Sequence, residues 1–159
     1  MVGLGEEIFA NEERHGVTEE VISRKLARIL GYVDALRKAD DISWETFTQD
    51  IRSRAFVERY LHLAIEEVLD VAHHLISANR WREPTSYRDV FQVLAENKVV
   101  AESHLARLQD MASFRNLLVH AYEKGDPEVV FGIFRTRLDD FLLFVNDING
   151  WVRQTSSNR

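Results

Sequence analysis

Cysteine is absent from this sequence of 159 residues, and the residues that most often make turns are scarce, with 2 prolines and 7 glycines. Without cysteine the chain has no disulfide bonds and no thiolate chemistry, which agrees with a reducing compartment. An all-β fold needs frequent turns, and this composition leaves little room for them. The chain is therefore expected to be helical, with any chemistry carried by other side chains.

Long hydrophobic runs are also missing. No run approaches the ~20 apolar residues that cross a bilayer, and the first residues lack the basic start and apolar block of a signal peptide. We therefore expect a cytoplasmic protein with no membrane partner. The length and a hydrophobic content of 45% fit one core, so residues 1–159 are predicted to form a single domain.

An excess of basic residues is lacking too, since the formal net charge is −6. Proteins that bind nucleic acid through its phosphates usually present a basic surface. No DNA partner is expected, and any contact with RNA has to be local. The basic residues available for such a contact include Arg80, Arg82, Lys98, Arg107 and Arg115. An acidic surface also fits a basic protein partner, and charge alone does not choose between the two.

Apolar residues recur at helical spacing through most of the chain. The predicted helices run from about Thr18 to Asp41, Ser43 to Ala78, Ser86 to Asn97, Ala101 to Lys124 and Pro127 to Ile148. Their predicted N-caps are Thr18, Ser43, Ser86 and Asp126. Residues 1–16 are expected to be a loose lead-in, with room for a short helix around Glu6 to Arg14, and residues 150–159 a frayed C-terminus. The predicted fold class is all-α, an up-and-down helical bundle of four main helices and one short helix.

The predicted helix from residue 43 to residue 78 is unusually long, ~54 Å if straight, so a bend is expected in it. It carries apolar residues away from its main hydrophobic stripe, namely Phe56, Tyr60, Leu63 and Val71. A helix with apolar groups on more than one face needs cover on each. A second protomer or two helices of the same chain can supply that cover, and the pattern leaves both open.

The stretch from Arg115 to Tyr122 divides its side chains between two sides of a predicted helix. At ~100° per residue, one arc collects a core stripe. The stripe consists of Met111, Phe114, Leu117, Leu118 and Ala121. Arg115, Asn116 and His120 fall on the other side, with Arg115 and His120 ~140° apart, and Tyr122 lies within ~20° of Arg115.

A solvated helix face is the simplest interpretation of an isolated Arg and His. Val119 and Ala112 lie on the face opposite the core stripe, however, and apolar groups there indicate contact with a second surface.

A metal site is not expected. His73 and His74 are adjacent on a helix and point ~100° apart, which is poor geometry for one ion. Glu66, Glu67 and Asp70 lie nearby, but a carboxylate-bridged metal pair needs such a motif on two helices, and there is no second copy. Glycine-rich phosphate loops and Ser or Thr nucleophile motifs are absent as well. No cofactor is predicted.

Acid–base chemistry beside a fixed cation remains. The imidazole of His120 can take or give a proton near neutral pH, and the guanidinium of Arg115 binds phosphate oxygens while keeping its charge. This pair suits RNA cleavage in which the 2′-hydroxyl attacks the adjacent phosphate, without a metal, to leave a 2′,3′-cyclic phosphate. A single His cannot easily serve both ends of this reaction.

The stretch resembles the motif of the HEPN superfamily, which is Arg, a polar residue, a short spacer and His. It is most similar to the HepT branch, whose pattern is Arg, four residues, His, one residue, Tyr. Arg115, His120 and Tyr122 fill these positions, and Asn116 is the polar residue. Residues 111–114, the turn that follows the motif, residues 60–72 and residues 86–94 also look like HepT sequence, so that the likeness covers roughly residues 20 to 148.

The resemblance implies a HEPN-like bundle and a metal-independent endoribonuclease, the toxin of a type VII toxin–antitoxin system. Its substrate would be RNA, such as tRNA or mRNA. In that family two protomers form a homodimer whose motifs share one cleft, with Arg115 and His120 as catalytic residues and Asn116 in a supporting polar role. The antitoxin is a minimal nucleotidyltransferase (MNT), which would transfer AMP to Tyr122 and block the cleft.

Two alternatives stay open at this point. The chain could be a non-catalytic HEPN module that binds a nucleotide or a partner through Arg115 and His120. It could also be a scaffold in which modification of Tyr122 matters and ribonuclease activity is vestigial.

Overall fold

The computed structural model describes residues 4–120 and 126–158. Its elements are α1 (Leu4–Lys38), α2 (Trp44–Gln49), α3 (Ile51–Ala78), α4 (Tyr87–Glu96), the 3-10 helix η1 (Glu102–His104), α5 (Leu105–Val119), α7 (Pro127–Thr136) and α8 (Leu138–Ser157). No strand occurs within these ranges. The predicted all-α class is therefore confirmed.

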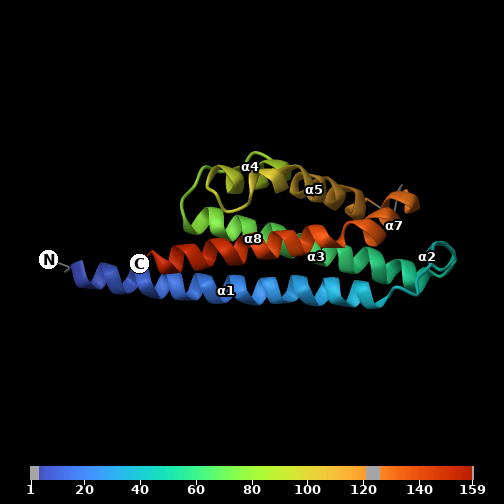
Figure 1. Cartoon of the computed structure of the whole chain (residues 1–159), viewed down its shortest axis with the longest axis horizontal. Coiled ribbons are helices and arrows are strands. Elements are labelled where there is room, and N and C mark those ends of the chain that lie inside the picture. The colour runs from blue at the N-terminus through green and yellow to red at the C-terminus, as the bar shows by residue number, and fades with distance from the viewer. Residues whose placement is uncertain (1–3, 121–125, 159) are drawn as a thin grey trace.

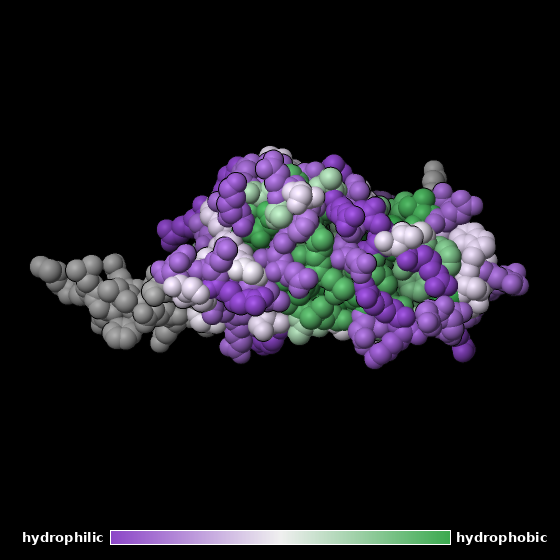
Figure 2. Space-filling view, viewed as in Figure 1, coloured by the Kyte–Doolittle hydropathy of each residue, from purple (hydrophilic) through white to green (hydrophobic). Residues whose placement is uncertain are grey.

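The helices form an elongated bundle of two layers (Figure 1). The long helices α1, α3 and α8 run side by side, and α4 and α5 lie over them as the second layer. The short helices α2 and α7 lie at one end, and both termini point to the other. Figure 2 shows hydrophobic side chains gathered in the middle of this face, with polar residues on either side. None of the helices described is both long and apolar enough to cross a membrane.

Both ends of the chain are more helical than the sequence predicts. Helix α1 begins at Leu4, so the expected loose lead-in and the helix start at Thr18 are wrong for the described part of residues 1–16. No proline interrupts this stretch, and the preceding turn supplies the hydrogen-bond partners that a cap would otherwise replace. Helix α8 continues to Ser157 rather than fraying from Gly150. Its last turns are held by Trp151, whose ring lies 5.7 Å from that of Trp81 in an edge-on pair.

Two of the predicted helices are each broken in two. Ser43 caps α2 as predicted, but that helix ends before Asp50, whose extended backbone (φ −102°, ψ 108°) starts α3. The Asp50 carboxylate accepts from Ser53 Oγ at 2.6 Å and from the Arg52 amide at 3.2 Å, and these bonds hold its pKa below the ordinary value. The expected bend is thus a capped break. The last predicted helix is likewise divided at Arg137 into α7 and α8.

The apolar residues beside the main stripe of α3 are covered mainly from within the chain. Val71 is fully buried. Tyr60 packs against Tyr32 of α1, with ring centroids 5.5 Å apart, and Phe56 lies 4.5 Å from Tyr60 by the same measure. Of the two alternatives that the pattern left open, the same chain supplies the cover at Val71 and Tyr60.

Candidate active site

The motif helix, α5, is shorter than predicted, because it ends at Val119 with His120 as its C-cap (φ −96°, ψ 2°). The predicted core stripe is confirmed for Met111 and Leu118, which are buried, while Phe114 and Leu117 are half-buried. Ala121 lies outside the described residues. Ala112, which the sequence assigned to a second surface, is buried against its own chain.

Contacts from three other elements fix the position of α5. At its start, His104 Nδ1 lies 2.8 Å from Asp147 Oδ2 on α8. Midway, Arg88 of α4 donates from Nη1 to Ser113 Oγ at 3.0 Å. On another side, Arg137 donates to Asp110 Oδ2 at 3.2 Å, and its guanidinium carbon lies 5.2 Å from the Phe114 ring centre. The motif is therefore carried on a helix that neighbouring elements hold along its length.

Arg115 projects from α5 into a notch between α3 and α4. Its Nε donates to Glu66 Oε1 of α3 at 2.8 Å, and its Cζ lies 4.6 Å from the ring centre of Tyr87, the first residue of α4. The Arg115 side chain remains 24% exposed. A carboxylate below and an aromatic face beside it hold the guanidinium in one orientation while leaving part of it open to solvent.

Glu66 and Tyr87 were not recognised as site residues from the sequence. Glu66 was considered only as a metal ligand, although it stands in a segment that resembles HepT sequence. The same Glu66 oxygen also lies 3.5 Å from His62 Nε2, one helical turn earlier. No sequence signal marks Glu66 as the partner of Arg115, because it stands on a polar helix face with other ionisable residues, such as His62 and Asp70.

The other motif residues lie apart from this notch. Asn116 and His120 are exposed, and the His120 amide donates to the Asn116 carbonyl at 3.2 Å. In the described part of the chain, no hydrogen bond or ion pair joins Arg115 to His120. Tyr122, the predicted AMP acceptor, lies outside the described residues. One protomer therefore does not bring the Arg and His side chains into contact.

Arg82, one of the basic residues considered for RNA contact, is engaged within the chain. Its guanidinium donates to both oxygens of Asp89, at 2.8 and 2.9 Å, and to Glu96 at 2.9 Å. The Arg82 guanidinium and the amide of Thr85 hold the pKa of Asp89 well below its ordinary value. This cluster fixes the loop before α4 rather than offering a free cation, so Arg82 is a poor choice for RNA contact.

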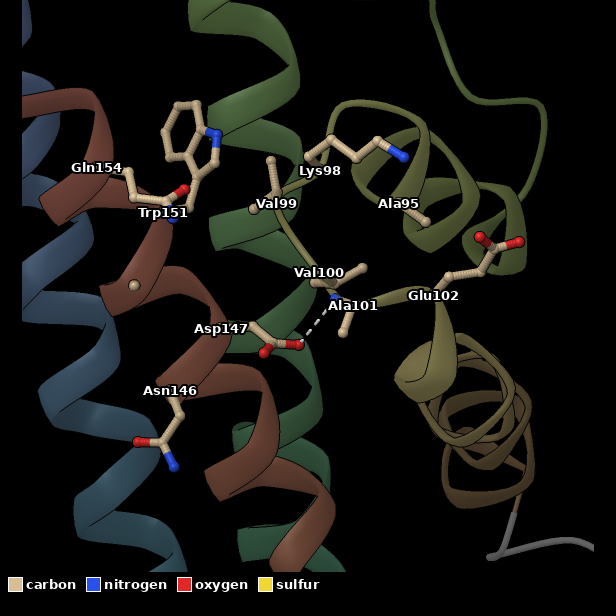
Figure 3. A pocket seen from close by; sticks show the side chains of 11 residues that line it. Ala95, Lys98, Val99, Val100, Ala101, Glu102, Asn146, Asp147, Trp151 and Gln154 are labelled. Carbon is tan, nitrogen blue, oxygen red and sulfur yellow. Dashed lines mark hydrogen bonds between the residues drawn. The ribbon is translucent and has the colours of Figure 1, made fainter. Parts of the chain in front are cut away.

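Two hollows lie next to different parts of the α4–α5 pair. One, of about 480 Å³, lies beside the motif and is lined by His73, Tyr87, Arg88, Ser113 and Asn116, among others. The second, of about 320 Å³, lies at the opposite end of α5, between α8 and the α4–α5 connection (Figure 3). There Asp147 accepts from the Ala101 amide at 3.3 Å, and Trp151 and Lys98 form the wall.

Metal ligands do not gather in the parts of the chain that the structure describes. No group of three or more His, Asp or Glu side chains there is arranged to hold an ion. The arrangement that remains is a fixed guanidinium in a notch and an exposed imidazole at the end of the same helix. Such a pair can bind a phosphodiester and move a proton.

An all-α bundle with Arg, a polar residue and His near the end of one helix defines a HEPN-type protein. A family model described as "Ribonuclease HepT-like" matches residues 11–148. The chain belongs to the HepT-like ribonuclease family and is an endoribonuclease of that class. The resemblance seen in the sequence is thereby confirmed, and of the alternatives it favours an enzyme over a non-catalytic module.

Characterised relatives cover most of the chain. The tRNA nuclease HepT of Aphanizomenon flos-aquae is 25% identical over 132 residues, which span 83% of this chain and 90% of that protein. The mRNA nuclease HepT of Shewanella oneidensis is 26% identical over 129 residues, which span 81% of this chain and 96% of that protein. Among solved structures, a tri-AMPylated Shewanella oneidensis HEPN toxin in complex with MNT antitoxin superposes with a TM-score of 0.73 at 27% identity, covering 82% of this chain and 97% of that one.

Proposed function

We propose that this endoribonuclease cleaves RNA with Arg115 and His120. The observation that carries the proposal is the placement of Arg115. Glu66 accepts its Nε–H, and within the described chain the two terminal nitrogens make no hydrogen bond, so their donors remain available to a ligand. A guanidinium held in this way presents its donors to phosphate oxygens at no further cost in orientation.

The reaction proceeds by transfer within the RNA strand. The 2′-hydroxyl oxygen attacks the neighbouring phosphorus and gives its proton to a base, the bond from phosphorus to the 5′-oxygen breaks, and that oxygen takes up a proton. The products are a 2′,3′-cyclic phosphate and a 5′-hydroxyl, without net use of water. Arg115 stabilises the extra charge on the phosphoryl oxygens, His120 exchanges the protons, and the exposed amide of Asn116 binds the strand.

A homodimer completes this site. The reaction needs a base and an acid, whereas one protomer supplies a single His120, separate from Arg115. A second copy that faces the motif helix contributes its own His120 and Arg115 to a shared cleft. The hydrophobic area on one face of the bundle is a surface of the kind that protein interfaces bury (Figure 2).

Tyr122 is the site of control in this proposal. A partner MNT nucleotidyltransferase antitoxin transfers AMP from ATP, as the phenol oxygen attacks the α-phosphate, pyrophosphate leaves and the phenolic proton is released. The added phosphate and base then occupy the cleft beside Arg115 and block RNA. The modification and MNT complex of the Shewanella oneidensis toxin support this assignment.

The substrate is RNA, and the two named relatives point to tRNA or mRNA as its class. The formal net charge of −6 means that RNA is bound locally rather than by a basic surface. The absence of cysteine supports a reducing compartment, and we place the protein in the cytoplasm.

The test is cleavage of labelled tRNA and mRNA by the wild type and by His120→Ala, with product ends analysed for the cyclic phosphate. Loss of roughly a hundredfold or more in rate is expected, because the proton transfers lose their side chain. Arg153→Ala, on the exposed side of α8, is the matched surface control and should cleave normally. Full activity of His120→Ala would remove His120 from the mechanism.

A further inference from the structure

The hollow beside the motif has the size and lining of a ligand site. Its volume of about 480 Å³ falls within the roughly 300–1,000 Å³ typical of small-molecule sites. It is an open hollow to which three helices contribute, with His73 from α3, Tyr87 and Arg88 from α4, and Ser113 and Asn116 from α5. None of its lining residues is acidic, whereas the second hollow is lined by Glu102 and Asp147. A phosphate-bearing ligand therefore favours the hollow beside the motif.

Tyr87 links this hollow to the catalytic Arg. The Tyr87 side chain lines the hollow and is 39% exposed, and its ring also packs against the Arg115 guanidinium at 4.6 Å. A planar ligand group, such as a base, that stacks on the exposed part of the Tyr87 ring therefore lies next to Arg115. Aromatic rings are the usual platform for unpaired RNA bases, because every base has a π-face.

Polar groups that can read a base surround the ring. Asn116 directly follows Arg115 in the sequence, and its side-chain amide offers both donors and an acceptor to a base edge. Arg88 and Ser113, joined by a 3.0 Å hydrogen bond, provide a cation and a hydroxyl on the same wall. His73 of α3 also belongs to the lining. The lining thus combines one stacking surface, one amide and one cation.

We propose that this hollow binds the single nucleotide next to the scissile phosphate and selects its base. The base stacks on Tyr87, its edge meets the Asn116 amide, and its phosphate lies between Arg88 and Arg115. This inference rests on the proposed cleavage of RNA and adds a specificity site to it. The hollow accounts for two exposed residues, Asn116 and Arg88, that proton transfer does not use.

The experiment compares RNA oligonucleotides that differ only in the base beside the cut. The wild type should prefer one base at that position. Asn116→Ala should reduce this preference, measured as the ratio of kcat/KM values for two bases, about tenfold. The reason is that the base edge loses the amide that hydrogen-bonds to it. Ser113→Phe, which fills the hollow while leaving Arg115 and His120 in place, should raise KM for the preferred RNA. Calorimetric titration with the four nucleoside monophosphates reports binding separately from cleavage.

Asn146→Ala is the matched control, since Asn146 is an exposed Asn in the lining of the second hollow (Figure 3). It should leave base preference and nucleotide binding unchanged. Should Ser113→Phe unfold, as judged by its melting curve, Ser113→Gln repeats the test with a smaller side chain. An unchanged preference in both hollow variants, or no base preference in the wild type, overturns the inference. If the wild type cleaves no RNA, the proposed function fails, and the nucleotide titration still decides on the hollow.

Discussion

The Arg115 Nε and the Glu66 Oε1 lie 2.8 Å apart, and this pair joins the motif helix α5 to the long helix α3. Residues 49 positions apart in the sequence thereby share one ion pair. The Tyr87 ring packs against the Arg115 guanidinium, so the guanidinium is held both by a carboxylate and by an aromatic ring. In the proposed reaction we infer that Glu66 is a positioning residue, because it would act through Arg115.

Replacement of Glu66 should reduce catalysis more than stability. In Glu66→Gln an oxygen acceptor remains but its charge is lost, so Arg115 becomes less well oriented. We expect kcat to fall roughly 10- to 100-fold with a small change in KM, since misplacement of a catalytic group affects the transition state most. Single-turnover kinetics measure this split. Glu66→Asp should recover part of the rate, and Glu45→Gln, at an exposed site on α2, should have no effect.

Tyr122→Phe should abolish modification while preserving the nuclease. In the proposed function the Tyr122 phenol oxygen is the nucleophile for AMP transfer, and phenylalanine keeps the ring but lacks that oxygen. Intact-mass measurement after incubation with an MNT partner and ATP should show added AMP on the wild type and none on the variant. Persistent mass addition on Tyr122→Phe would place the acceptor elsewhere.

Arg137→Ala should destabilise the fold by about 3 kcal/mol. Arg137 donates to Asp140 Oδ2 at 2.7 Å, and the Asp140 side chain is only 6% exposed, so its removal leaves a buried carboxylate without its main partner. Urea unfolding followed by circular dichroism measures this loss. The exposed Arg153→Ala should change the free energy of unfolding by less than about 0.5 kcal/mol.

The ion pairs of the loop before α4 should stabilise the fold at neutral pH and lose this effect at acidic pH. Arg82 and the Thr85 amide lower the folded-state pKa of Asp89 below its ordinary value of 3.8. A lowered folded pKa means that the ionised carboxylate stabilises the fold above the unfolded pKa, and that this contribution is lost as the pH falls through the folded pKa. Arg82→Gln should therefore melt at a lower temperature than the wild type at pH 7, and the gap should narrow below about pH 4. A gap that is constant with pH would contradict this.

The helices that were predicted well depend on local signals. Ser43, Ser86 and Asp126 each cap a helix as predicted, with Pro127 at the first helical position after Asp126. A cap joins a side chain to an amide a few residues ahead, so it can be seen in a short window. The helix over the described part of residues 1–16 and the break at Arg137 were not predicted, and at Asp50 the structure has a break where only a bend was expected. At Asp50, side-chain bonds to Arg52 and Ser53 compete with continuation of the helix.

The candidate site divides along the same line. The sequence could single out the residues that stand within one motif, namely Arg115, Asn116, His120 and Tyr122. Glu66 and Tyr87 could not be singled out, since each lies on another helix and contacts Arg115 only once the bundle has formed. The hollow could not be predicted either, because residues from three helices line it. The division between two helix faces was also sound for the core side, where Met111 and Leu118 are buried. It did not show that Arg115 and His120 occupy different surroundings.

Local periodicity, capping and the short motif were enough to predict an all-helical chain and to single out the motif residues, because those features act between residues that are neighbours along the backbone. The partners of Arg115, the break points of the helices and the hollow beside Asn116 depended on packing. They are made by side chains from separate helices, and only burial of the shared core brings those helices together.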